Sequence, residues 1–123
     1  MTTTHELTAA RSNGRLIALW LLSGLVALVF LGAGGGKLAG AAAMVEVFDK
    51  VGLGQWFRYV TGVLEVGGAV GLLIPGYAFY AAALLAAVMV GAIIAEVTVV
   101  GHSALPAVVL LGLTAIIAYL RKP

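Results

Sequence analysis

The sequence predicts an all-α membrane protein: four transmembrane helices in an antiparallel bundle, with an additional amphipathic interfacial helix between the first and second spans. Of the 123 residues, 63% are hydrophobic and only 10% are charged, whereas a soluble domain is about half apolar and about a quarter charged. The apolar residues form four long runs that are apolar on every face, while transmembrane strands alternate apolar and polar residues. Short connections between runs predict antiparallel neighbours.

The first run extends from Leu16 to Gly35 and contains no charged residue. Because a bilayer core requires about 20 apolar residues in a helix, this run is long enough to span a membrane. It is also longer than the apolar part of a typical signal peptide, so we expect it to be retained. Residues 1–14 are expected to form a mobile cytoplasmic tail, and residues 15–123 the membrane domain.

The segment between the first and second spans, residues 41–55, has the spacing of an amphipathic helix. Apolar residues recur at helical intervals: Met44, Val47, Phe48 and Val51. Charged residues occupy the opposite face: Glu46, Asp49 and Lys50. Such a helix is expected to lie at the membrane surface. There it either covers the mouth of the bundle or acts as a lid or docking surface above a site.

The other three runs follow at short intervals. The second, Val60 to Ile74, is preceded by aromatic residues typical of a membrane interface and ends at a Pro-Gly turn. The third extends from Tyr77 to Val100, and the fourth from Leu105 to Leu120. An even number of spans places both termini on one side, and the basic residues near the termini predict that this side is cytoplasmic.

Apart from the basic residues near the two termini, the ionisable residues inside or next to the spans are expected in one half of the membrane domain, the non-cytoplasmic half. An ionisable group costs about 2.5–3.5 kcal/mol at the centre of a span, so it marks a candidate functional site. Glu65 is expected about 12 Å below the membrane surface, from the helix rise. The predicted polar intramembrane site comprises Lys37, Glu65 and Glu96, with Arg58, Thr61 and His102 beside them.

This polar cluster has three interpretations. In the first, Lys37 and Glu65 form an ion pair that fixes helix register, and Glu96 is simply hydrated. In the second, the cluster is a pocket for a lipid headgroup or a quinone ring. In the third, Glu65 takes up protons, although the cytoplasmic half offers no polar continuation of a proton path.

Small residues four positions apart recur in three of the runs: Gly32 and Gly36, Gly67 and Gly71, and Ala87, Gly91 and Ala95. This spacing permits close approach of helix backbones. Packing within the bundle accounts for it, and the alternative is a homo-oligomer or a membrane-protein partner. The glycines at 34–36 weaken a helix, so we expect either close helix contact or an opened helix end there.

Composition excludes several classes of function. The absence of cysteine excludes a disulfide scaffold and a thiolate metal site. A net charge of +2, carried by scattered residues, is not typical of nucleic-acid binding. The sequence also lacks a phosphate-binding loop, a zincin helix and a nucleophile elbow. We therefore expect no catalytic residue, no metal ligand and no independent enzyme.

Several segments, in this order, resemble the DoxX-like family of small four-helix membrane proteins. They are residues 30–38 (FLGAGGGKL), 44–48 (MVEVF), 61–65 (TGVLE), 72–75 (LLIP) and 89–94 (MVGAII). The resemblance covers roughly residues 15 to 120. It implies a four-span protein of the bacterial inner membrane, and it makes Lys37 and Glu65 the counterparts of the family's lysine and glutamate. Where this branch often carries a histidine, the chain has Glu96.

The family takes its name from a subunit of an archaeal thiosulfate:quinone oxidoreductase, and its members are often linked to membrane redox assemblies. The expected function is therefore a membrane subunit or accessory protein of a quinone-linked assembly, with a quinone or a lipid as the ligand. The alternatives are a small proton or solute transporter or channel, and a structural partner or assembly factor for another membrane protein.

Overall fold

The computed structural model describes residues 4–123, and the side chains of residues 13–123. Its elements are α1 (Thr4–Ala39), α2 (Ala42–Val51), α3 (Gln55–Leu72), α4 (Ala78–Ala95), the π-helical turn η1 (Glu96–Val100) and α5 (Leu105–Arg121). The described residues contain no strand. The predicted all-α class is therefore confirmed, and so is a separate helix between the first and second long helices.

Two helical segments are long and apolar enough to cross a membrane: Asn13–Ala39 of α1, and Ala78–Val100, which is α4 with η1. The third apolar helix, α5, is shorter. α3 is as long as α4, but it is less apolar because it contains Arg58 and Glu65. The described fold thus contains two candidate spans by length and composition, where the sequence predicted four.

α1 begins at Thr4 and continues without a break through the glycines at 34–36 to Ala39. The predicted mobility of residues 1–14 stays a prediction, and residues 1–3 lie outside the described part of the chain. At the other end, Gly40 has a φ of 75°, a conformation that favours glycine. The amides of Gly40 and Ala41 donate to the carbonyls of Lys37 and Gly36. This pair of bonds is a Schellman motif and ends the helix, so no opened end precedes Lys37.

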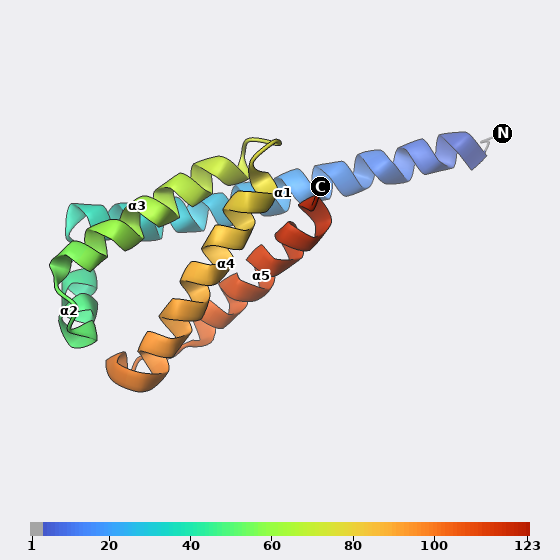
Figure 1. Cartoon of the computed structure of the whole chain (residues 1–123). Helices are drawn as coiled ribbons and strands as arrows, with labels where there is room; N and C mark the ends of the chain where they lie inside the picture. Colours follow the sequence, from blue (N-terminus) through green and yellow to red (C-terminus); the bar gives the residue numbers. More distant parts are fainter. Residues whose placement is uncertain (1–3) are drawn as a thin grey trace.

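The helices form two antiparallel pairs, α1 with α3 and α4 with α5 (Figure 1). The pairs meet near the turn between α3 and α4 and diverge toward their other ends (Figure 1). At the diverging ends, α2 contacts both α3 and η1. The amphipathic prediction for α2 is confirmed, because Phe48 is buried and the charged residues Glu46, Asp49 and Lys50 are exposed.

The hydrophobic core lies where the four long helices meet. α1 contributes Val26, Ala27 and Phe30, and α3 contributes Ala69 and Leu72. The remaining members come from α4 and α5: Ala81, Ala82, Leu85, Met89 and Ile117. This core is built nearer to the α3–α4 turn, so the polar residues of α3 lie beyond it, toward α2.

The glycines that permit close helix packing are mostly not those that the four-residue spacing suggested. A Cβ added at Gly68 would lie 2.7 Å from atoms of Leu85, and one at Gly71 would lie 2.8 Å from Ala81. By contrast, a Cβ at Gly32, Gly36, Gly67 or Gly91 would have no atom within 4 Å. The interpretation as packing within the bundle therefore holds for Gly71 and is wrong for those four, because they face away from the other helices.

Candidate functional site

A buried ion pair connects α1 with α3. Lys37 Nζ lies 2.6 Å from Glu65 Oε1, and the exposed fractions of the two side chains are 13% and 1%. Most of the side chains around this half of α1 and α3 are apolar. The fold thus contains the Lys37–Glu65 ion pair between helices that the first interpretation of the cluster predicted.

The two side chains meet because α1 and α3 are antiparallel (Figure 1). Every side chain of an α-helix leans toward the N-terminus of its own helix. Lys37, near the end of α1, therefore leans toward the interior, and Glu65 leans toward that same end of the pair. The two charged groups therefore approach each other across the helix pair.

Two glycines bring the backbones close enough for this pair to form. A Cβ at Gly34 would lie 2.9 Å from the carbonyl oxygen of Gly62, and a Cβ at Gly62 would lie 3.0 Å from the carbonyl oxygen of Gly34. The contact is reciprocal, and each glycine precedes a member of the ion pair by three residues. The close helix contact that the sequence predicted near Lys37 is therefore confirmed at Gly34.

Arg58 joins the site through the backbone. Its side chain is 5% exposed, and its Nη1 donates a hydrogen bond to the carbonyl of Lys37. That carbonyl also accepts from the amide of Gly40 and belongs to the last turn of α1, where the helix dipole concentrates negative partial charge. Arg58 thus caps α1 and holds the start of α3 against it.

Gln55 extends the network to α2. Its Oε1 accepts a hydrogen bond from Arg58 Nε at 2.8 Å. Its Nε2 donates to the carbonyl of Val45 at 3.1 Å and to Asp49 Oδ1 at 2.8 Å. One amide side chain therefore links α2 to Arg58, the arginine that caps α1. Arg58 in turn binds the backbone of Lys37, whose side chain pairs with the buried carboxylate.

No role for Gln55 was predicted from the sequence. Its position three residues before Arg58 places both on one helix face, and that spacing was the available signal. Its bonds to Val45 and Asp49 depend on the turn between α2 and α3. Periodicity within a single helix contains no information about that turn.

The other predicted site residues lie outside this network. Thr61 Oγ1 donates to the carbonyl of Phe57, one turn earlier in α3, at 2.9 Å. His102 is exposed in the connection before α5. Within residues 13–123, no hydrogen bond or ion pair joins Thr61, Glu96 or His102 to Lys37, Arg58 or Glu65.

Glu96 begins η1, the π-helical turn that ends α4. Its Oε2 is buried and has no hydrogen-bond partner among the described side chains. Glu96 follows α4 and so belongs to the α4–α5 pair. At this end the α4–α5 pair diverges from the α1–α3 pair, which contains Lys37 and Glu65 (Figure 1). The structure therefore brings Lys37, Glu65 and Arg58 together and leaves Glu96 as a separate polar group.

Replacing Gln55 by Leu is expected to release α2 from the bundle. The change removes three hydrogen bonds, and a typical bond contributes roughly 0.5–1.5 kcal/mol. Amide hydrogen exchange in α2 should then accelerate by about fivefold or more, while exchange in α4 is unchanged. Glu46→Gln, on the exposed face of the same helix, serves as the matched control. Equal exchange in both variants would contradict the role assigned to Gln55.

Chemically, the site offers an ammonium group and a carboxylate in an apolar environment, with a guanidinium beside them. Such groups can hold a proton or donate a hydrogen bond to a carbonyl oxygen. Within residues 13–123 there is no group of three or more His, Cys, Asp or Glu side chains that could hold a metal ion. The arrangement therefore suits hydrogen bonding and charge pairing.

Comparison with known proteins shows which family the chain is similar to. The profile of the DoxX-like family matches residues 21–118, a range that includes the ion pair, Gln55 and Arg58. No curated protein and no solved structure matches the chain. Because the family match extends over more than half of the 123 residues, the chain belongs to the DoxX-like family.

Proposed function

We propose that this DoxX-like protein is a four-span protein of the bacterial inner membrane, with both termini in the cytoplasm. It serves as a membrane subunit or accessory protein of a quinone-linked redox assembly. Its ligand, a quinone or a lipid headgroup, binds at the Lys37–Glu65 pair. The observation that carries the proposal is this ion pair, 2.6 Å long and buried between apolar helices.

The distribution of residues on α3 supports its role as a span. α3 has 18 residues, a length of about 27 Å, which approaches the hydrocarbon thickness of about 30 Å. Its ionisable residues Arg58 and Glu65 are buried against the protein. Its exposed face is apolar over most of its length and includes Val60, Val63 and Val70. The modest hydropathy of α3 thus comes from groups that lipid does not touch.

The chemistry of the pair supports a carbonyl-bearing ligand. A quinone presents two carbonyl oxygens, which accept hydrogen bonds, and an apolar tail that fits between membrane helices. Lys37 supplies a donor at the end of α1, and its side chain remains 13% exposed. α2, which closes over this end, is positioned to control access from the membrane surface.

Quinone binding to the purified protein tests the proposal. The chain has two tryptophans, so Trp20→Phe leaves Trp56, near the start of α3, as the only one. A short-tailed quinone is expected to quench Trp56 fluorescence with a saturable dependence. Lys37→Gln should weaken binding by about tenfold or more, because a hydrogen bond to a charged group contributes roughly 1.5–3 kcal/mol.

Lys50→Gln is the matched control, since Lys50 lies on the same half of the molecule but is exposed. It should leave the affinity unchanged. Quenching that does not saturate, or equal affinity in the Lys37 and Lys50 variants, would contradict binding at the ion pair. In that case, the transporter alternative would be favoured if proteoliposomes with the wild-type protein show an ion flux and those with Glu65→Gln do not.

A further inference from the structure

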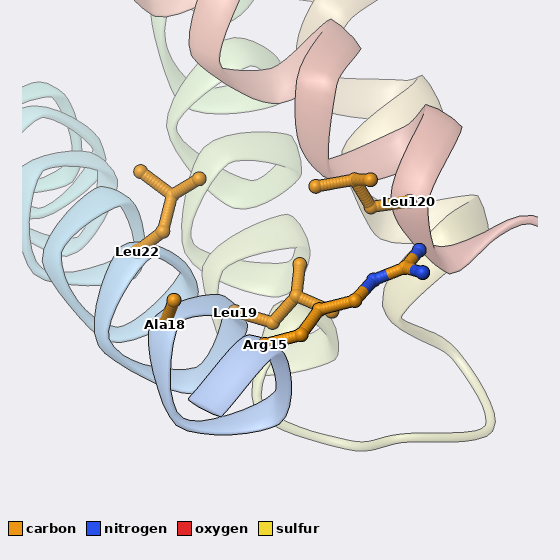
Figure 2. A pocket seen from close by; sticks show the side chains of 5 residues that line it. All are labelled: Arg15, Ala18, Leu19, Leu22 and Leu120. Carbon is orange, nitrogen blue, oxygen red and sulfur yellow. The ribbon is translucent and has the colours of Figure 1, made fainter. Parts of the chain in front are cut away.

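The end of the molecule opposite to the ion pair contains an apolar groove between α1 and α5. The groove has a volume of about 310 Å³ and is lined by Arg15, Ala18, Leu19, Leu22 and Leu120. Figure 2 shows the Arg15 side chain extending from α1 toward the last turn of α5, beside Leu120. The groove is therefore apolar along its length and has a guanidinium group at its edge.

A second arginine lies at the same end. The guanidinium of Arg121 lies over the ring of Trp20, 5.0 Å from its centroid, in a cation–π contact between α5 and α1. Its Nε and Nη2 are buried and have no hydrogen-bond partner among residues 13–123. A buried donor without a partner is costly, so this guanidinium has unused capacity to bind an oxygen-rich group.

No acidic side chain of residues 13–123 lies beside these cations. The acidic residues of residues 13–123 all lie toward α2 and η1: Glu46, Asp49, Glu65 and Glu96. The ion pairs within those residues, Lys37–Glu65 and Lys50–Glu46, are also at that end. Lys122 adds a further positive charge beside Arg121, over the ring of Tyr119. Among the side chains of residues 13–123, the end with Arg15 and Arg121 therefore carries basic groups and no acidic ones.

We propose that this end of the α1–α5 interface binds an anionic phospholipid. The phosphate lies between the guanidinium groups of Arg15 and Arg121, and one acyl chain lies in the groove along Ala18, Leu19 and Leu22. A free phosphate would use the arginines but leave the apolar groove unfilled, so the combination of charge and groove favours a lipid. Basic pockets between membrane helices on the cytoplasmic side are suited to such headgroups.

The inference depends on the membrane placement proposed above, but not on the quinone-linked role. In the proposed orientation, Arg15 and Arg121 face the cytoplasmic leaflet, which carries the anionic lipids. The exposed rings of Trp20 and Tyr119 then lie at the depth where aromatic residues anchor a protein to the interface. A bound lipid at this position would hold the first and last helices of the domain together.

Lipid titration of the purified protein in nonionic detergent tests the proposal. The probes are dioctanoyl phosphatidylglycerol, dioctanoyl phosphatidylcholine with the same chains, and glycerol 3-phosphate, which has no chains. Phosphatidylglycerol should bind most tightly. Arg15→Gln and Arg121→Gln should each raise its dissociation constant by about fivefold, the factor expected for one basic residue near a lipid headgroup.

Two further variants make the test independent of folding. Ala18→Phe, a change at an exposed position, fills the groove and should weaken binding of phosphatidylglycerol while both arginines remain. Lys50→Gln, at the other end of the molecule, should leave the affinity unchanged. Equal affinity for the two phospholipids would overturn the proposal. Binding of glycerol 3-phosphate as tight as that of phosphatidylglycerol, or an affinity that neither Arg15→Gln nor Ala18→Phe alters, would also overturn it.

Discussion

Replacing Lys37 by Met is expected to lower the free energy of unfolding by about 3–5 kcal/mol. The substitution keeps most of the side-chain volume but removes the charge, so Glu65, 1% exposed, stays buried without its partner. Removing one member of a buried pair is costly for this reason, whereas the pair as a whole contributes little net stability. Unfolding in mixed micelles, followed by circular dichroism, measures the difference.

The exposed pair on α2 provides the control. Lys50 Nζ lies 3.6 Å from Glu46 Oε1, one helical turn away, and both side chains are largely in solvent. Lys50→Met should therefore change the free energy of unfolding by about 0.5 kcal/mol or less. Similar effects of the Lys37 and Lys50 substitutions would mean that Lys37 is solvated and that the pair between α1 and α3 is not buried.

Alanine substitutions at two adjacent glycines of α1 are expected to change the free energy of unfolding in opposite directions. At Gly34 the added methyl group meets the backbone of Gly62 at 2.9 Å and Val66 Cγ2 at 2.9 Å. A backbone atom cannot move aside as a flexible side chain can, so Gly34→Ala should push α1 and α3 apart. The expected loss of unfolding free energy is about 1–3 kcal/mol, as for overpacked cores.

At Gly35 the same methyl group meets no atom within 4 Å. Because alanine is preferred over glycine inside a helix, Gly35→Ala should raise the free energy of unfolding by about 0.5–1 kcal/mol. The two variants have identical composition and differ only in the helix face that they change. Effects of the same sign would contradict the reciprocal contact between Gly34 and Gly62.

The helices were predictable because they depend on local patterns. The apolar runs locate α1, α4 with η1, and α5, and the spacing of Met44, Val47 and Phe48 identifies α2. The Lys37–Glu65 pair was also predictable, since an antiparallel order of two helices brings together charges near the end of one helix and in the first half of the next. These features follow from the rise per residue, the helical period and the order of the helices along the chain.

Other parts of the site depend on how helices rotate and diverge, which a single sequence does not specify. Whether Gly34 or Gly32 faces α3 depends on the rotation of α1 about its axis. Glu96 stands apart because the α4–α5 pair diverges from α1 and α3, although the sequence predicted that it lies near Lys37. Gln55 gains its role from the turn after α2, where two elements meet at an angle that neither determines alone.

A double-mutant cycle at Lys37 and Glu65 measures whether these two residues form a buried ion pair. Unfolding free energies are compared for the wild type, Lys37→Met, Glu65→Leu and the double variant. We expect each single variant to be strongly destabilised and the double variant to recover most of the loss, since it leaves no unpaired buried charge. A coupling energy of about 2 kcal/mol or more would follow. Additivity within about 0.5 kcal/mol, the behaviour of independent sites, would contradict a buried ion pair between α1 and α3.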